Sequence, residues 1–185
     1  MTAPETMIAS AEQIVRALDE LARGIVRGRR DGTPLALVGI RTRGVPLAQR
    51  LAQRLHDNHS LDAPVGALDI TLYRDDLSQI AHAPVLRGTE VPFGVDGVEV
   101  VLVDDVLFTG RTIRAAMDAI CDLGRPAAIR LAVLVDRGHR ELPIQPDYCG
   151  LRVPTELTEK IEVRLQEIDE VDEIWKEPKR EGVTG

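Results

Sequence analysis

The sequence predicts an α/β fold in which a mainly parallel β-sheet is flanked by helices. Three short apolar runs, at residues 35–40, 98–103 and 129–135, have the length and the Val, Leu, Ile and Ala content of buried parallel strands. Amphipathic segments with helical spacing stand before and between them. Strands that alternate with helices indicate right-handed βαβ units, because each helix carries the chain back to the same end of the sheet.

Three helices are predicted around these strands. Ser10 is suited to an N-cap, and Gln13 three residues on completes the pattern of a capping box for a helix that runs to Gly28. Another helix is predicted over residues 111–123, and Gly124 ends it. Between these two, a helix has its apolar face at Leu47, Leu51 and Leu55.

Weaker patterns fill the remaining sequence. Residues 65–73 alternate apolar and polar side chains and predict a strand, and residues 161–165 predict another. The charged stretch at 74–92 contains Pro and Gly and is typical of a long loop or hairpin, so we expect a flexible lid there. Residues 1–9 and 176–185 are expected to be loose termini.

The composition favours one globular domain over residues 1–185. A hydrophobic content of 44% and a charged content of 29% are ordinary for such a protein. No apolar stretch reaches the roughly 18 residues of a membrane span, and the N-terminus lacks the pattern of a signal peptide. Cys121 and Cys149 form no C-x-x-C pair, so we expect reduced thiols and a cytoplasmic protein with no membrane partner.

The segment at residues 101–112 joins a predicted strand to a predicted helix and reads Val-Leu-Val-Asp-Asp-Val-Leu-Phe-Thr-Gly-Arg-Thr. Ligands of open α/β sheets bind at the carboxyl ends of such strands. Gly110 allows a tight turn, and the start of the following helix offers N–H groups and a positive dipole end to an anion. The hydroxyls of Thr109 and Thr112 are donors suited to phosphate oxygens. The segment therefore predicts a phosphate site.

Asp104 and Asp105 come at the end of the strand, in a loop expected over residues 104–110. Two adjacent carboxylates can accept hydrogen bonds from two vicinal hydroxyl groups, as on a ribose. Alone, such a pair also suits a solvated turn or a divalent-metal site. The segment lacks the lysine of a Walker loop and the Gly-x-Gly-x-x-Gly of a dinucleotide fingerprint. We interpret it as a phosphate site beside a ribose site.

This segment resembles the phosphoribosyl pyrophosphate (PRPP) signature of the type I phosphoribosyltransferases. Three further segments, at residues 38–44, 69–76 and 135–143, read Val-Gly-Ile-Arg-Thr-Arg-Gly, Asp-Ile-Thr-Leu-Tyr-Arg-Asp-Asp and Val-Asp-Arg-Gly-His-Arg-Glu-Leu-Pro. Together the four segments resemble the PyrR family, whose members are bifunctional pyrimidine-operon attenuators and uracil phosphoribosyltransferases. The likeness extends from about residue 10 to about residue 165.

The resemblance implies that uracil and PRPP react to give UMP and pyrophosphate, by displacement at the anomeric carbon. Asp104 and Asp105 would be the catalytic pair that holds the ribose hydroxyls, and no protein nucleophile is needed. Mg²⁺ is implied as a cofactor bound mainly through PRPP, with no metal site made by protein side chains alone. The implied contacts to PRPP or UMP are Thr42, Arg43, Asp104, Asp105, Val106, Leu107, Phe108, Thr109, Gly110, Arg111, Thr112 and Arg137.

Some of these roles follow from position within the family pattern. Thr42 and Arg43 fall where the family binds pyrophosphate, and Arg74 falls where its lid begins. Val135 and Ile161 fall at the base pocket that the resemblance implies.

The resemblance also implies UMP-responsive binding of pyrimidine-operon leader RNA. Gln145 and Leu151 stand where the family usually has basic residues, and a net charge of −7 argues against a general positive field. Two alternatives stay open, a purine-salvage phosphoribosyltransferase and a non-catalytic sensor of PRPP or a nucleotide. The family further implies a homodimer or higher homo-oligomer. Arg137, His139 and Arg140 match its RNA-binding pattern, and Arg152, next to Leu151, is expected to add a basic contact there.

Overall fold

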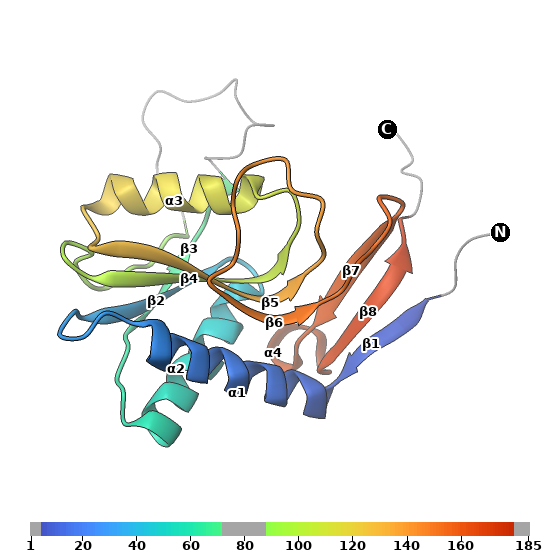
Figure 1. Ribbon diagram of the computed structural model, residues 1–185, viewed down its shortest axis with the longest axis horizontal. Coiled ribbons are helices and arrows are strands. Elements are labelled where there is room, and N and C mark those ends of the chain that lie inside the picture. Colours follow the sequence, from blue (N-terminus) through green and yellow to red (C-terminus); the bar gives the residue numbers. More distant parts are fainter. Residues whose placement is uncertain (1–4, 72–87, 180–185) are drawn as a thin grey trace.

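The computed structural model describes residues 5–71 and 88–179 and confirms the predicted α/β fold. Its main sheet is parallel throughout, with the strand order β3-β2-β4-β5-β6 (Figure 1). The inner strands β2 and β4 are buried for most of their length, as their continuous apolar sequences predict. The strands are β2 (Leu35–Ile40), β3 (Val65–Leu68), β4 (Glu99–Leu107), β5 (Ala128–Asp136) and β6 (Tyr148–Arg152).

Helices cover both faces of this sheet, with α1 and α2 on one face and α3 on the other (Figure 1). The side-chain oxygen of Gln13 accepts the N–H of Ser10 at 2.9 Å, which confirms the predicted capping box. No helix in the described part of the chain is long and apolar enough to cross a membrane. The bounds are α1 (Ala11–Gly28), α2 (Gly44–His59) and α3 (Arg111–Leu123).

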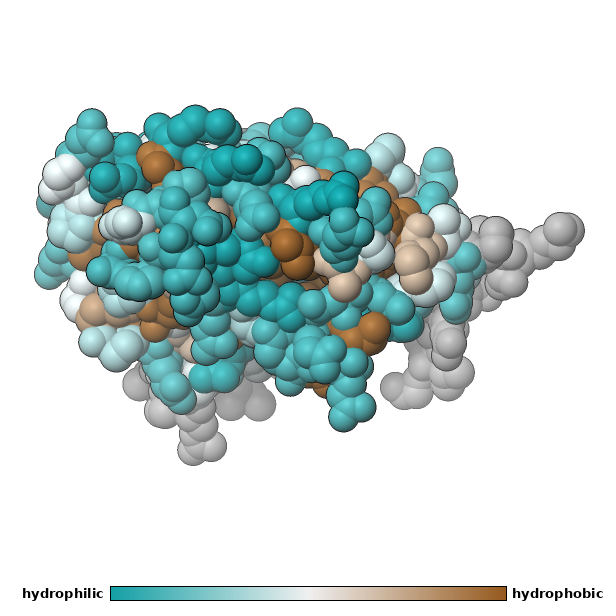
Figure 2. Space-filling view, turned by 90° about the horizontal axis from the view of Figure 1, so that it is seen from below, coloured by the Kyte–Doolittle hydropathy of each residue, from teal (hydrophilic) through white to brown (hydrophobic). Residues whose placement is uncertain are grey.

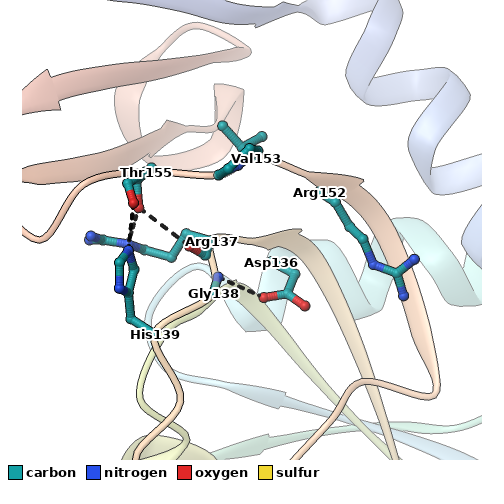
Figure 3. A pocket seen from close by; sticks show the side chains of 8 residues that line it. Asp136, Arg137, Gly138, His139, Arg152, Val153 and Thr155 are labelled. Carbon is teal, nitrogen blue, oxygen red and sulfur yellow. Dashed lines mark hydrogen bonds between the residues drawn. The ribbon is translucent and has the colours of Figure 1, made fainter.

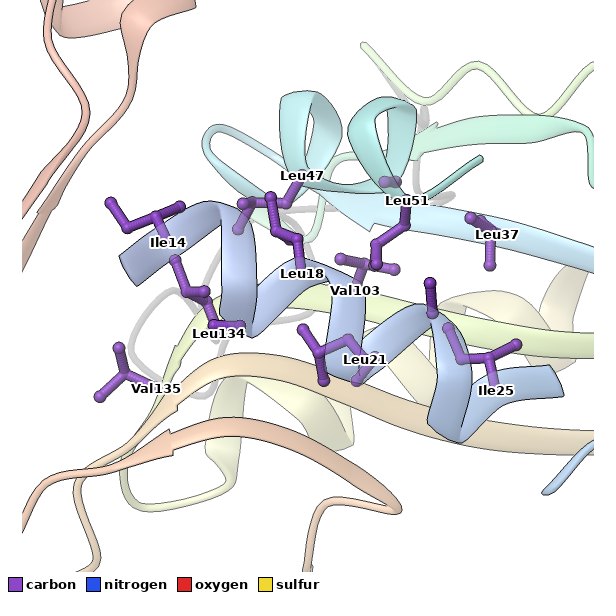
Figure 4. Close-up of a cluster of buried hydrophobic side chains, with 14 of the residues drawn as sticks. Ile14, Leu18, Leu21, Ile25, Leu37, Leu47, Leu51, Val103, Leu134 and Val135 are labelled. Atoms are coloured by element: carbon purple, nitrogen blue, oxygen red, sulfur yellow. The ribbon is translucent and has the colours of Figure 1, made fainter. Parts of the chain in front are cut away.

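The apolar faces of α1 and α2 form one core with the sheet. Figure 4 shows Leu18 and Leu21 of α1 close to Leu47 and Leu51 of α2, with Val103 of β4 next to them. Each of these five side chains is 3% exposed or less. Seen from the side of α1 and α2, the molecular surface is mostly hydrophilic, with scattered apolar patches (Figure 2). Burial of apolar area, at about 25 cal/mol per Å², holds these helices in place and so fixes the loops at the edge of the sheet.

A second, antiparallel sheet lies beside the main sheet and has the order β1-β8-β7 (Figure 1). The expected loose termini at residues 1–9 and 176–185 are therefore wrong for the parts that pair here. β1 and β8 pair from Thr6↔Lys176 to Ser10↔Glu173, with a shift of register between Met7 and Ala9, and Ile174 is fully buried. The short helix α4 (Gln166–Asp169) connects β7 to β8. The strands are β1 (Thr6–Ser10), β7 (Glu159–Arg164) and β8 (Glu173–Pro178).

The strand that leads to the acidic pair is longer than predicted. We expected it to end at residue 103 and a loop to begin at Asp104, but β4 continues to Leu107. The reason is its neighbour β5, because the parallel pairing continues through Asp104↔Val133 and Leu107↔Asp136. Asp104 and Asp105 therefore belong to a rigid strand.

Strand β3 is shorter than the strand expected at residues 65–73. The Asp69 carboxylate accepts the N–H of Thr71 at 3.0 Å and its hydroxyl at 2.6 Å, a local turn that takes the chain out of the sheet. Of the lid expected over residues 74–92, the part from Arg74 to residue 87 lies outside the described residues.

Candidate active site

Asp104 and Asp105 lie near the carboxyl end of β4. The Asp104 carboxylate accepts the N–H of Asp105 at 2.9 Å, and the Asp105 carboxylate accepts the N–H of Val106 at 2.9 Å. Asp104 is 7% exposed. Burial raises the pKa of its carboxyl well above the usual value, and the adjacent charge of Asp105 adds to this effect. The pair offers oxygen acceptors to neighbouring hydroxyl groups at a place where an added positive charge would be stabilised.

A tight turn joins β4 to α3. Gly110, the N-cap residue of α3, has a φ of 93°, in the left-handed region that favours glycine. The Thr109 hydroxyl accepts the N–H of Arg111 at 3.4 Å. The helix start adds N–H groups and a partial positive charge, which suit a phosphate. The phosphate contacts expected from the sequence lie together in this strand end, turn and first helical turn: Val106, Leu107, Phe108, Thr109, Gly110, Arg111 and Thr112.

The segment expected to bind pyrophosphate packs tightly against β4. A Cβ atom on Gly44 would stand 2.3 Å from the carbonyl oxygen of Val103, and one on Gly39 would stand 2.4 Å from the carbonyl oxygen of Gly44. Glycine at both positions lets the start of α2 approach β2 and β4 this closely. Thr42 is exposed just before this contact, and its peptide bond to Arg41 is cis.

Arg43 has a protein partner. Its guanidinium donates to the Asp169 carboxylate, with Nη2–Oδ1 and Nε–Oδ2 distances of 2.9 and 3.3 Å. The two side chains are 28% and 22% exposed, respectively. Asp169 also accepts the N–H of Leu165 at 2.9 Å, so its position is fixed. In this structure Arg43 therefore ties the start of α2 to α4.

Arg137 directs its side chain onto the turn at residues 107–110, which we call the phosphate turn. Its guanidinium carbon lies 4.1 Å from the centre of the Phe108 ring. Its Nε donates to the Thr155 hydroxyl at 3.1 Å, and Nη2 donates to the Glu159 carbonyl at 2.8 Å. Arg137 is only 4% exposed. The side chain thus connects the turn after β4 with the segment that precedes β7.

A cavity of about 440 Å³ opens at the carboxyl ends of β5 and β6 (Figure 3). Val135 and Ile161, expected at a base pocket, are 0% and 9% exposed and belong to the hydrophobic core. Figure 3 shows that Arg152 points away from the Arg137 side chain. The lining residues are Asp136, Arg137, Gly138, His139, Arg152, Val153, Pro154 and Thr155.

The four residues expected at an RNA surface differ in exposure. Arg137 is 4% exposed, and the Arg140 side chain is 13% exposed. The Nε2 atom of His139 lies 2.5 Å from the carbonyl oxygen of Thr155. Arg152 is exposed to solvent. Of this set, Arg152 has the side chain that is most accessible to a large partner.

Sequence reasoning missed Gly44, Thr155 and Asp169 as contributors to the site. Gly44 has a detectable signal, because it ends the motif at residues 38–44 and begins a helix. Thr155 and Asp169 are single polar residues in short connections, and no local pattern distinguishes them.

Fold and site together define a phosphoribosyltransferase. The family model described as "Phosphoribosyl transferase domain" matches residues 5–167. A relative named "Bifunctional protein PyrR" from Pelotomaculum thermopropionicum is 59% identical over 169 residues, which cover 91% of this chain and 93% of that protein. A relative of the same name from Deinococcus deserti is 54% identical over 177 residues, which cover 95% and 97%. The chain belongs to the PyrR family, as the four sequence segments predict.

Solved structures support the fold independently. A hypoxanthine phosphoribosyltransferase from Staphylococcus aureus has a TM-score of 0.68 at 17% identity, with 97% of this chain and 94% of that chain covered. The enzyme of that activity from Trypanosoma cruzi has a TM-score of 0.69 at 18% identity, with 94% and 97% covered. At these identities the likeness concerns the fold alone.

Proposed function

We propose that the chain transfers the phosphoribosyl group of PRPP to uracil, giving UMP and pyrophosphate. The observation that carries this proposal is the meeting of three features at one edge of the sheet: the Asp104–Asp105 pair, the turn at Gly110 that starts α3, and the segment at Thr42. They offer acceptors for ribose hydroxyls, donors for a 5′-phosphate and a contact for the pyrophosphate group. Membership of the PyrR family supports uracil as the base.

The acidic pair suits the charge that develops in this reaction. Displacement at the anomeric carbon gives a transition state with positive charge on the ribose ring. The burial that raises the pKa of Asp104 makes its negative charge costly, and a cation beside it reduces that cost. Positioning of the reactants and exclusion of water lower the barrier further, so no protein nucleophile is needed.

Mg²⁺, when bound, neutralises charge on the pyrophosphate leaving group. Within residues 5–71 and 88–179, no three side chains of His, Cys, Asp or Glu come together as a metal site. We therefore expect PRPP and water to supply most of the ligands, with Asp104 and Asp105 as the nearby carboxylates. A chelator should abolish turnover and leave the melting temperature of the protein unchanged.

A panel of bases tests the proposed reaction. Purified protein is incubated with PRPP, Mg²⁺ and either uracil, hypoxanthine or guanine, and pyrophosphate release is measured. We expect release with uracil, and we expect it to be lost in Asp105→Asn. Turnover of a purine without turnover of uracil would establish the purine-salvage alternative. Binding of PRPP without turnover of any base would establish the sensor alternative.

We propose that the protein also binds pyrimidine-operon leader RNA in a UMP-responsive way. Membership of the PyrR family and the exposed Arg152 beside the cavity support this. A filter-binding assay with leader RNA, with and without UMP, is the test, and scrambled RNA of equal length is the control. We expect UMP to strengthen binding, and Arg152→Gln to weaken it with a shallower salt dependence. Equal binding of the scrambled RNA would exclude the regulatory role.

We further propose a homodimer or higher homo-oligomer that acts in the cytoplasm. Cys121 and Cys149 are free thiols in the structure, which fits a reducing compartment. Light scattering after gel filtration should give at least twice the chain mass of 20.3 kDa. A mass equal to that of one chain would exclude the oligomer.

A further inference from the structure

Three consecutive carbonyl groups of the phosphate turn are held by one neighbouring segment, residues 137–142. The Leu107 carbonyl accepts the N–H of Arg137 at 3.1 Å. The Phe108 carbonyl accepts Nη1 of Arg140 at 2.9 Å. The Thr109 carbonyl accepts the N–H of Glu141 at 2.9 Å. Two of these donors are backbone groups, and the middle one is a side chain.

This pattern fixes the direction of three N–H groups. The peptide bonds after Leu107, Phe108 and Thr109 are trans and planar, so each carbonyl points opposite to the N–H of the next residue. With the carbonyls turned toward residues 137–142, the N–H groups of Phe108, Thr109 and Gly110 point away from that segment. Successive N–H groups that end in a left-handed residue, here Gly110, form a concave site for an anion.

The Arg140 side chain is built into the protein. Its guanidinium pairs with the Asp136 carboxylate at 2.7 Å and donates to the Ile144 carbonyl at 2.8 Å, besides its bond to Phe108. A further bond, of 3.2 Å, goes to the Gly138 carbonyl. With 13% exposure and four partners, this side chain has the surroundings of an anchor and not those of a surface contact.

We propose that Arg140 is a positioning residue of the reaction, which aims the N–H groups of Phe108, Thr109 and Gly110 at the 5′-phosphate of PRPP. The proposal rests on the proposed function. It gives Arg140 a role at the active site, in addition to the RNA contact that the family pattern implies. Arg140 acts through the Phe108 carbonyl, because that bond sets the middle peptide of the three.

The test compares Arg140→Gln and Arg140→Lys with Arg54→Gln. Arg54 is a matched control, since its side chain is 19% exposed and pairs with Asp19 at 2.9 Å, in the contact between α1 and α2. We expect Arg140→Gln to raise the KM for PRPP about tenfold, or about 1.4 kcal/mol, while the KM for uracil changes less than about twofold. The KM of Arg140→Lys for PRPP should lie between those of the wild type and Arg140→Gln, because one ammonium cannot reach all four acceptors. Arg54→Gln should lower the melting temperature and leave both KM values unchanged.

Chemical rescue separates positioning from simple loss of stability. Ethylguanidinium added at millimolar concentration should restore PRPP affinity to Arg140→Ala and should not affect Arg54→Gln. If Arg140→Gln or Arg140→Ala does not fold, the KM of Arg140→Lys decides. An unchanged KM for PRPP in Arg140→Lys and Arg140→Gln, with RNA binding lost, would overturn the proposal.

Failure of the proposed function can be recognised separately. If the wild type turns over no base, the Kd for PRPP is measured by calorimetric titration in place of the KM. We expect this Kd to be about tenfold higher in Arg140→Gln, on the order of 1.4 kcal/mol. If the wild type is active and the Arg140 variants bind PRPP as it does, only the role of Arg140 is wrong.

Discussion

The guanidinium carbon of Arg137 lies 4.1 Å from the centre of the Phe108 ring, so a buried cation stacks on the middle of the phosphate turn. The arginine also donates to Thr155, in the segment before β7, and to the carbonyl of Glu159, the first residue of β7. The turn at the edge of the main sheet is thereby linked to the antiparallel sheet. The geometry of the phosphate site therefore depends on contacts that come from far along the chain.

Arg137→Gln should destabilise the fold. It removes the cation–π contact and leaves buried acceptors without a donor, and we expect the free energy of unfolding to fall by about 2–4 kcal/mol. Denaturant titration measures this. The control is Arg164→Gln, whose guanidinium lies 5.9 Å from the Trp175 ring and whose side chain is 37% exposed. The free energy of unfolding of the control should fall by about 1 kcal/mol or less. An equal loss in both variants would contradict the stabilising role of the buried Arg137 contacts.

Asp104→Asn should stabilise the protein and impair catalysis. Asparagine has nearly the same shape as aspartate and carries no charge to bury, so we expect a higher melting temperature at pH 7. Without the negative charge near the ribose ring, kcat/KM for PRPP should fall about 100-fold. A variant that is less stable than the wild type at pH 7 would contradict the burial argument.

The pH dependence of stability gives a second test of Asp104. Because its folded-state pKa is raised, the folded chain keeps a proton that the unfolded chain has released. The free energy of unfolding should therefore fall as pH rises from about 3.9, the usual Asp value, through the folded-state pKa, with a slope of about 1.4 kcal/mol per pH between those two values. Denaturant titrations across this range should show the fall in the wild type. The fall in the free energy of unfolding should be smaller in Asp104→Asn.

Gly44→Ala should disrupt the approach of α2 to β4. The added Cβ would stand 2.3 Å from the Val103 carbonyl oxygen, and backbone on both sides would have to move. We expect a loss of about 1–3 kcal/mol in the free energy of unfolding and a higher KM for PRPP. Gly94→Ala is the matched control, because its Cβ would meet nothing within 4 Å. The control should change stability by about 0.5 kcal/mol or less.

Asp169→Asn should release Arg43 for an anionic ligand. Arg43 pairs with Asp169 at 2.9 Å, and a partly exposed pair of this kind contributes up to about 1 kcal/mol. If pyrophosphate competes for the guanidinium, its affinity should rise about threefold in the variant, measured by calorimetry with Mg²⁺-pyrophosphate. Asp172→Asn, which removes a partner of Arg50 at 2.8 Å, is the control. Equal affinity in both variants would mean that Arg43 stays on α4 when pyrophosphate binds.

The central part of the fold could be predicted from local sequence. Leu35–Ile40 and Arg111–Leu123 have the predicted bounds, because a continuous apolar run and a helix closed by Gly124 are signals within one segment. β1, β6 and β8 were not predicted. They are short, partly exposed strands, and pairing with distant segments stabilises them.

The site was predictable as motifs but not as a network. The acidic pair and the turn at Gly110 are contiguous in sequence, so their chemistry can be read from the residues. The partner of Arg43 is Asp169, which lies 126 positions away, and no pattern connects the two. In the same way, no local pattern predicts that the Arg140 side chain donates to the Phe108 carbonyl, because the two residues are 32 positions apart in different loops.

Incorporation of labelled uracil into UMP is the most direct test of the proposed reaction. Wild-type protein is incubated with PRPP, Mg²⁺ and labelled uracil, and UMP and pyrophosphate are quantified in the same sample. The account predicts UMP and pyrophosphate in equal amounts, with a kcat in the ordinary enzyme range of about 1–10³ s⁻¹. Pyrophosphate release without UMP, or no reaction with uracil while a purine is converted, would contradict it.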